Sequence, residues 1–160
     1  MKNFLFIILL LLGISPTYAQ YIPCVKMEIV FDNCANKKNM DSLLIKEGFK
    51  YQNSTKNENS VEYKYKKAKS KQIKSQDISI FVSPDGYSYL SLTSKDKKFL
   101  EHYKAELINN GYELTGVAEQ RTGNVIEKFQ NQKYEIMLFQ IIENDYTSLY
   151  YLELRNKSVD

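Results

Sequence analysis

Two short sequence patterns each occur twice in this chain, in the same order and at nearly the same spacing. Leu44–Phe49 (LIKEGF) returns as Leu107–Tyr112 (LINNGY) at an offset of 63 residues. Tyr89–Leu92 (YLSL) returns as Tyr151–Leu154 (YLEL) at an offset of 62 residues. Agreement between two independent patterns predicts an internal duplication, with one repeat at about 36–93 and the other at about 94–156.

The N-terminal segment has the pattern of a secretion signal. Lys2 is followed by the apolar run Phe4–Leu12, and Thr17-Tyr18-Ala19 then supplies a small–x–small cleavage sequence. We expect a signal peptide that is cleaved after Ala19 and a mature protein that is periplasmic or secreted. A transmembrane anchor would need about 20 apolar residues, and lipidation at Cys24 would need a small residue just before the cysteine, so both alternatives are disfavoured.

Removal of residues 1–19 leaves 20–160, which is enough chain for a single exported domain without a transmembrane span. The formal charge of the whole chain is +3, which is too small to define a partner. Lysine greatly outnumbers arginine, which occurs only at Arg121 and Arg155. Because arginine is the preferred fork for phosphates and bases, nucleic acid is not an expected partner.

Cys24 and Cys34 are candidates for a structural disulfide, since an exported protein with two cysteines usually oxidises them. The intervening Val25–Phe31 reads as a strand, and seven extended residues span about 23 Å. Bridged Cα atoms lie only roughly 4.4–6.8 Å apart, so the two interpretations conflict. Either the strand is shorter or bent, or the two cysteines do not bridge each other. We favour the disulfide, with the strand as the part that gives way.

Each repeat is predicted to begin with a helix that ends at a glycine. In the second repeat, apolar residues recur at helical spacing across Asp96–Asn110. In the first repeat, a shorter helix ends at Glu47. Gly48 and Gly111 follow the two helices, where glycine lets the chain adopt the left-handed conformation and turn back into a strand.

Four strands in meander order are predicted after each helix, so that each repeat reads α-β-β-β-β. Hairpin-length connections make these strands antiparallel, and helices on one face of such a sheet give an α+β fold. The two repeats form either one continuous eight-stranded sheet or two packed sheets. The polar segment Ser54–Ser60 is interpreted as a loop. The predicted strands are Phe49–Gln52, Val61–Tyr65, Ile78–Val82, Tyr87–Thr93, Tyr112–Val117, Asn124–Phe129, Glu135–Ile142 and Leu149–Arg155.

This element order, with its L-I-x-x-G-aromatic pattern at Leu44–Phe49 and Leu107–Tyr112, resembles the tandem helix-plus-four-strand repeats of β-lactamase inhibitor proteins and related small envelope modules. The resemblance would cover most of the mature chain. It implies the same α+β architecture, and it carries over no binding residue.

No catalytic, cofactor-binding or metal-binding motif is present in the sequence. His102 is the only histidine, and it lacks cysteine or carboxylate ligands at the spacing of a zinc site. The chain has no G-x-S-x-G, P-loop or H-E-x-x-H motif. We therefore expect a non-enzymatic protein without a cofactor. A small hydrolase or lyase with carboxylates between the repeats is the alternative, since Asp and Glu are spread through both repeats.

A lysine-rich segment between Tyr63 and Lys74 is the strongest local charge anomaly, because it contains no acidic residue. One interpretation is a cationic surface for an anionic polysaccharide, lipid head group or acidic protein. The other is a solvated strand edge, which lysines commonly protect against aggregation, and this plainer interpretation is favoured. The lysines concerned are Lys64, Lys66, Lys67, Lys69, Lys71 and Lys74.

Tyrosines at Tyr87, Tyr89 and Tyr151 alternate with residues of the opposite strand face, so they are candidates for an interaction surface. Tyrosine offers a large contact area and is enriched at interfaces, although aromatic residues also simply suit strands. The first hypothesis is a module that binds a protein or envelope component through the sheet face that no helix covers. A purely structural envelope component that pairs with its own copy is a further alternative.

Overall fold

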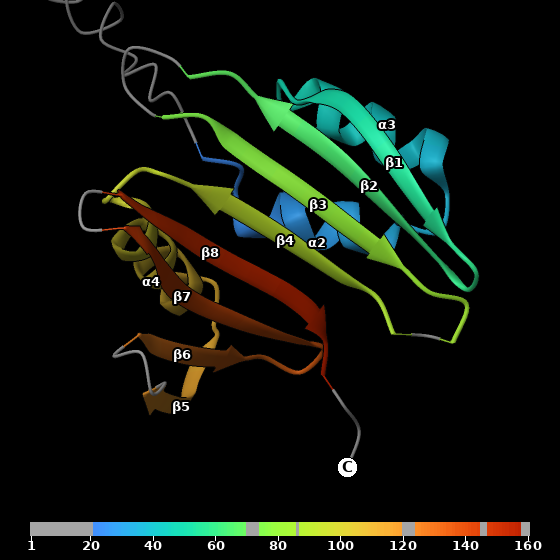
Figure 1. Cartoon of the computed structure of the whole chain (residues 1–160). Coiled ribbons are helices and arrows are strands. Elements are labelled where there is room, and N and C mark those ends of the chain that lie inside the picture. The colour runs from blue at the N-terminus through green and yellow to red at the C-terminus, as the bar shows by residue number, and fades with distance from the viewer. Residues whose placement is uncertain (1–20, 70–73, 86, 120–123, 145–146, 158–160) are drawn as a thin grey trace, which may run out of the picture.

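The protein is an α+β structure built on one eight-stranded antiparallel sheet (Figure 1). The computed structural model describes residues 21–69, 74–85, 87–119, 124–144 and 147–157. The expected signal peptide and its cleavage point after Ala19 lie outside these ranges. Within them, no helix has the length and apolar character needed to cross a lipid bilayer.

The eight strands form one continuous sheet and not two packed sheets. Its strand order is β1-β2-β3-β4-β8-β7-β6-β5, so each group of four runs outward from a central β4–β8 pair. At this centre the two copies of the tyrosine–leucine pattern pair with each other, with Leu90 opposite Leu154 and Leu92 opposite Leu152. All four leucines are fully buried. The strands are β1 Lys50–Asn57, β2 Ser60–Lys67, β3 Gln76–Val82, β4 Tyr89–Ser94, β5 Glu113–Glu119, β6 Val125–Gln130, β7 Tyr134–Asn144 and β8 Thr147–Asn156.

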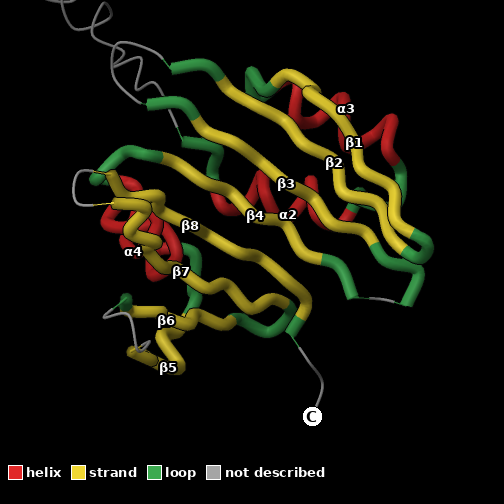
Figure 2. The backbone as a smooth tube through the Cα atoms, in the orientation of Figure 1, coloured by secondary structure: helices red, strands yellow, loops and turns green. Residues whose placement is uncertain are grey.

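Helices cover one face of the sheet and leave the other face open (Figure 2). Helix α3 (Lys37–Lys46) precedes β1 and helix α4 (Phe99–Asn109) precedes β5, so the order of one helix and four strands occurs twice. The apolar side of α4 buries Phe99, Tyr103 and Leu107, as its helical spacing predicts. Descent of both halves from one duplicated segment remains a prediction.

A third helix replaces the strand that was predicted for Val25–Phe31. Helix α2 spans Cys24–Asp32 and buries Cys24, Met27, Val30 and Phe31. The buried positions follow the spacing i, i+3, i+6 and i+7, which is the period of a helix and not the alternation of a strand. The prediction was wrong because this short apolar run fits both patterns, and packing against β4, β8 and both other helices selects the helix.

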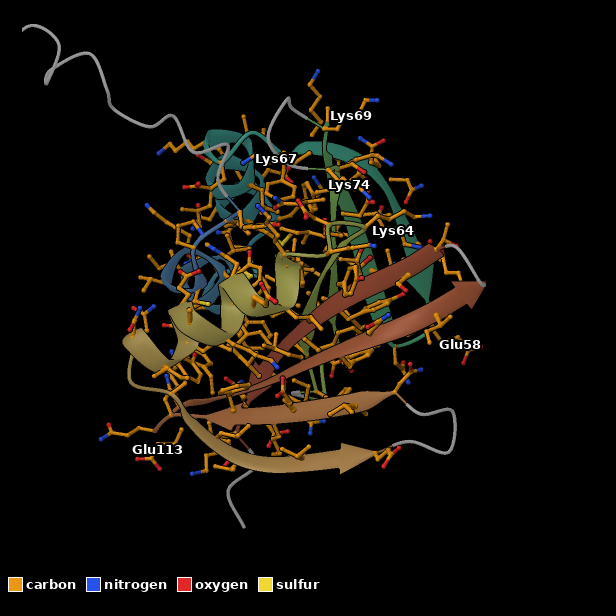
Figure 3. The ribbon with its side chains drawn as sticks, turned by 90° about the vertical axis from the view of Figure 1, so that its left-hand side faces the viewer. Glu58, Lys64, Lys67, Lys69, Lys74 and Glu113 are labelled. Carbon is orange, nitrogen blue, oxygen red and sulfur yellow. The ribbon has the colours of Figure 1, made fainter. Side chains whose placement is uncertain are left out.

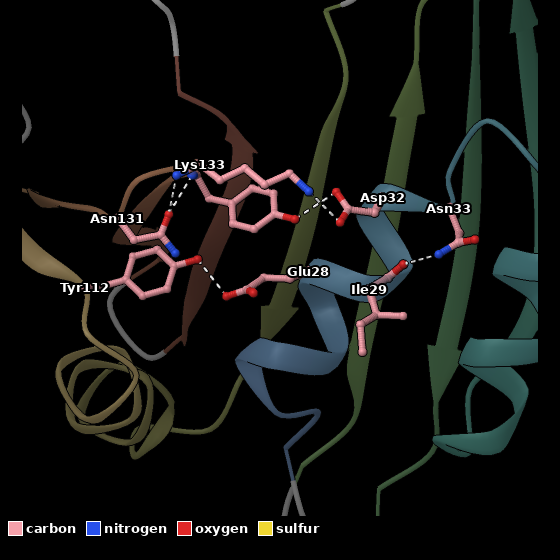
Figure 4. Close-up of polar contacts among 8 residues, drawn as sticks. Glu28, Ile29, Asp32, Asn33, Tyr112, Asn131 and Lys133 are labelled. Carbon is pink, nitrogen blue, oxygen red and sulfur yellow. Dashed lines mark hydrogen bonds and ion pairs between the residues drawn. The ribbon is translucent and has the colours of Figure 1, made fainter.

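Helix α2 is tied to the second half of the chain by polar contacts over long sequence separations. The backbone N–H of Cys24 donates to Oε1 of Glu106 on α4 at 2.7 Å, which caps an otherwise unpaired donor of the first turn. The hydroxyl of Tyr112 donates to Glu28 at 2.8 Å, and Lys133 contacts Asp32 at 2.6 Å (Figure 4). These contacts hold α2 across the middle of the sheet.

The predicted disulfide between Cys24 and Cys34 is not formed, and both thiols are free. Cys24 is the first residue of the nine-residue helix α2 and Cys34 comes two residues after its end. At 1.5 Å per residue the helix separates its own ends by about 12 Å. A bridge requires Cα atoms within about 7 Å of each other. The disulfide was predicted from the expected export of the protein, and the helix, like the extended strand that it replaces, keeps the two cysteines too far apart to bridge.

Both predicted turning points are confirmed as left-handed glycines. Gly48 has φ 85° and Gly111 has φ 79°, and each follows the last turn of its helix. The next residue in each case returns its N–H to the helix: Phe49 donates to the Leu44 carbonyl and Tyr112 donates to the Leu107 carbonyl, both at 3.0 Å. The two aromatic side chains are then buried in the core.

Replacing Gly111 with alanine is expected to lower the free energy of unfolding by about 1–2 kcal/mol, because an L-residue is strained in this conformation. A Cβ atom there would meet no atom within 4 Å, so the loss would come from the backbone alone. Gly116→Ala is the matched control, since Gly116 lacks a positive φ and its added Cβ would lie 3.9 Å from Lys128. Urea denaturation measures both, and equal losses would contradict the assignment.

The two edges of the sheet are formed by β1 and β5. Every residue of β1 is exposed, and in β5 only Gly116 is partly covered. Most of the segment predicted as the loop Ser54–Ser60 belongs to the β1–β2 hairpin, with Asn57 opposite Ser60. Its polar composition reflects an edge strand exposed on both faces, which shows no apolar alternation.

Candidate functional site

The helix-free face carries two groups of aromatic side chains at the centre of the sheet. In the first group, Phe81 on β3 stacks on Tyr89 on β4, with ring centroids 5.2 Å apart and planes at 13°. Tyr87 precedes β4, is 55% exposed, and lies edge-on to Tyr89 at 6.2 Å. The geometry makes a continuous, partly exposed aromatic surface over β3 and β4.

The second aromatic group lies on β7 and β8. Phe139 and Tyr151 stand opposite each other, with centroids 4.9 Å apart and planes at 3°. Tyr151 is also opposite Thr93 of β4, whereas Tyr89 is opposite Arg155 of β8. The two aromatic groups are thus four residues apart along the strands, or about 13 Å.

Burial raises the pKa values of both tyrosines that lie within these strands. For Tyr89 and Tyr151 the main cause is desolvation, with smaller contributions from Glu62 and Glu143 respectively. Both hydroxyls therefore stay protonated at neutral pH and can donate a hydrogen bond to a ligand. The three predicted tyrosines are thus placed on or beside one face, in two groups.

A buried carboxylate lies beside the first aromatic group, and the sequence alone did not reveal it. Glu135 on β7 is 2% exposed. Arg155 donates from Nε at 2.8 Å and makes a second contact through its terminal nitrogen. Lys128 lies 2.5 Å from the other carboxylate oxygen, and Gln130 donates to that oxygen at 2.6 Å.

These donors control the ionisation of Glu135. Burial alone would raise its pKa, but the hydrogen bonds from Lys128, Arg155 and Gln130 outweigh it and lower the pKa to about 2. Arg155 is held in turn, because its contact with Glu135 raises its pKa further, with Tyr87 as an additional partner. The cluster fixes an arginine side chain next to Tyr87 and Tyr89.

Glu153 is a second carboxylate on the same face, with different surroundings. It lies on β8 opposite Ser91 on one side and Met137 on the other. Burial raises its pKa, Arg155 opposes this effect, and the charge of Glu135 adds to it. Two neighbouring carboxyl groups therefore have pKa values shifted in opposite directions.

The lysine-rich segment is divided between the two faces of the sheet (Figure 3). Lys64 and Lys66 project from the helix-free face and pair with Glu62 at 3.2 Å and Asp77 at 3.4 Å. Lys67 lies on the helix side, with its ammonium 5.6 Å from the ring centroid of Phe49. Lys69 and Lys74 are exposed beyond the strands, and Lys71 lies outside the described residues.

His102 lies on the exposed side of α4. Its Nε2 atom is 3.3 Å from Glu106, and its ring is 4.6 Å from that of Tyr21. Glu106 also caps α2 at Cys24, where burial raises the thiol pKa well above its usual range. A thiol held protonated is a poor nucleophile, so Cys24 is unsuited to nucleophilic catalysis. The contact between Cys24 and Glu106 instead attaches α2 to α4.

Two hollows in the described part of the surface lie away from the two carboxylates. One of about 360 Å³ is lined by β5 and the β6–β7 turn, including Glu113 and Asn131. Another of about 320 Å³ lies between α4 and the ends of β6 and β7, next to Leu100 and Ile142. Neither is lined by Glu135 or Glu153. Among the described residues, no three His, Cys, Asp or Glu side chains gather so as to hold a metal ion.

Comparison of the chain with family models, with curated proteins and with solved structures finds no match.

Proposed function

We propose that this chain is an exported, non-enzymatic protein that binds a protein or envelope component through its helix-free sheet face. The observation that carries the proposal is the pair of stacked aromatic groups, Phe81 with Tyr89 and Phe139 with Tyr151, at the centre of that face. Export is supported by the apolar segment Phe4–Leu12 and the cleavage sequence that follows it.

The chemistry of this face suits protein recognition. Tyrosine, phenylalanine, methionine and arginine are enriched at interfaces, and the face combines Tyr89, Tyr151, Met137 and Arg155 on adjacent strands. Cross-strand stacking holds Tyr89 and Tyr151, and Glu135 holds Arg155, before a partner arrives. A preorganised surface loses less conformational entropy on binding than a flexible one.

A site-specific cross-linker tests this surface. Placed at Tyr151, a photoreactive residue is expected to capture a discrete partner from the envelope fraction, because the position lies inside the proposed interface. The matched control is the same residue at Ile108, which is 62% exposed on α4, a helix of the opposite face. The double variant Tyr89→Ser/Tyr151→Ser should weaken binding of the captured partner at least about thirtyfold if these are interface hot spots.

Equal capture at Tyr151 and Ile108 would contradict the proposal, as would unchanged affinity of the double variant. Circular dichroism of the double variant serves as the folding control. Both tyrosines are only partly buried, so the sheet is expected to survive their replacement.

The alternative of a carboxylate-dependent hydrolase or lyase is favoured by one observation, the opposite pKa shifts of Glu135 and Glu153. Acid–base pairs in enzymes show such a divergence. Against this, Glu135 already receives hydrogen bonds from Arg155 and Gln130, which leaves it little capacity to act on a substrate. We therefore favour binding of a partner over catalysis as the function of this face.

A further inference from the structure

Glu153 is a partly buried carboxylate at the centre of the helix-free face. It lies on β8, one of the two central strands of the sheet (Figure 1). Ser91 of β4 is opposite it on one side and Met137 of β7 on the other, so both direct neighbours across the strands are uncharged. Within the described part of the chain, Glu153 takes part in no ion pair.

The basic side chains near Glu153 are bound to a different carboxylate. Arg155 lies two residues further along β8, on the same face. It contacts Glu135 through two of its nitrogen atoms, and Lys128 contacts the other oxygen of the same carboxylate. Glu135 therefore takes both cations of this part of the face, and Glu153 is left without one.

The fold does not compensate the charge of Glu153. Burial raises its pKa, Arg155 opposes this effect without cancelling it, and the charge of Glu135 adds to it. A raised pKa means that the ionised carboxylate is less favourable in the folded protein than in the unfolded chain. A cation brought by a ligand would supply the compensation that the chain itself does not.

Aromatic rings border Glu153 on both sides of β8. Tyr151 precedes it by two residues on the same face, and Tyr89 and Phe139 are diagonal neighbours on β4 and β7, at roughly 7–8 Å and within reach of long side chains. The stacking partners Phe81 and Phe139 lie on the outer strands β3 and β7. The uncovered ring faces of Tyr89 and Tyr151 are therefore turned towards the β4–β8 centre.

We infer that the partner of the helix-free face is a protein that places a basic side chain on Glu153, between the rings of Tyr89 and Tyr151. The inference rests on the proposed function, because it names the chemistry of a partner at the same face. Arginine suits this position better than lysine. Its guanidinium group pairs with a carboxylate through two hydrogen bonds, stacks on aromatic rings, and is less strongly hydrated than an ammonium group.

The lysines on the same face do not oppose a cationic ligand. Lys64 and Lys66 are paired with Glu62 and Asp77. They lie on β2, three strands from β8, which corresponds to about 14 Å. This distance exceeds the screening length of about 8 Å at physiological ionic strength. An acidic ligand at the centre would instead meet the uncompensated charge of Glu153.

Two peptides that differ only in charge test the inference. Acetyl-leucyl-arginyl-leucine amide is compared with the same peptide carrying citrulline, a neutral side chain of nearly the same shape. Titration of the full chain, followed by NMR chemical shifts, is expected to give at least about tenfold tighter binding of the arginine peptide. Glu153→Gln should remove this preference. The control Glu101→Gln makes the same change in net charge at an exposed position of α4 and should keep it.

Urea denaturation shows whether Glu153→Gln remains folded. The folded protein disfavours the ionised form of Glu153, and pH 7 lies above the ordinary pKa of a glutamate, about 4.3. The neutral amide is therefore expected to raise the denaturation midpoint at pH 7, so a lost preference for arginine would not come from unfolding. A lower midpoint would show that the chain itself compensates this charge, which overturns the inference.

Three binding results would also overturn the inference. They are equal affinities of the two peptides for the wild type, an arginine preference that survives Glu153→Gln, and binding of neither peptide at about 10 mM. Failure of the proposed function gives a different result, since Tyr89→Ser/Tyr151→Ser would then leave the affinity for the captured partner unchanged. If both peptides bind equally and both lose affinity in this double variant, the face is the binding surface and only the inferred charge is wrong.

Discussion

Replacing Met27 with alanine is expected to lower the free energy of unfolding by about 2–5 kcal/mol, the range for removing a buried methionine side chain. Met27 is 0% exposed and lies on the inner side of α2. That helix packs against β4, β8 and both other helices, so a cavity at Met27 would open where the two halves of the molecule meet. Urea denaturation followed by circular dichroism measures the loss.

The matched control for Met27 is Val25→Ala on the same helix. Val25 is 46% exposed, so its truncation should change the stability by less than about 1 kcal/mol. If the segment were the strand that its composition suggested, residues 25 and 27 would point to the same face, and the two variants would lose similar stability. Similar losses of unfolding free energy in the two variants would therefore contradict the assignment of this segment as a helix.

Local periodicity was sufficient to predict most of the fold. The helix before Gly111 and the strands around Leu90 and Leu152 have apolar residues at one clear period, and the structure confirms their type within a few residues. Gly48 and Gly111 could be predicted because the left-handed conformation that follows a helix favours glycine. These sequence patterns are local, so they can be recognised without knowing which helices and strands pack together.

The errors lie where local pattern and tertiary environment disagree. Helix α2 was predicted as a strand because seven residues are too few to separate the two periods. The disulfide was predicted from the expected export of the protein, which carries no information on the distance between the two cysteines. The edge strand β1 was predicted too short, because a strand exposed on both faces has no apolar alternation. Its identity depends on pairing with β2, which no local pattern reports.

The candidate site also contains some residues that local periodicity could predict and others that it could not. Alternation along β4 and β8 was enough to place Tyr89 and Tyr151 on one face, since the period of a strand is local. The contact of Glu135 with Lys128 and Arg155 depends on β7 lying between β6 and β8 in a particular register. Register across three strands is a non-local property, so the buried carboxylate could not be predicted from the sequence.

Glu135 should make the free energy of unfolding decrease steeply as the pH falls below about 4.5. Its pKa is lowered from 4.5 to about 2 in the folded protein, so the folded state favours the ionised form. The stabilisation is fully present above pH 4.5, the unfolded value, and is lost as the pH falls toward 2. The size of the shift corresponds to at most about 3 kcal/mol.

Comparison of wild type with Glu135→Gln isolates this contribution, because the amide cannot ionise. At pH 7 the variant is expected to be less stable by up to about 3 kcal/mol, and the difference should shrink toward zero near pH 2. Glu153, whose raised pKa acts in the opposite direction, is present in both proteins and largely cancels. The exposed Glu113→Gln is the control and should stay within about 0.5 kcal/mol of wild type. A stability difference that does not change with pH would show that Glu135 acts through packing and not through its charge.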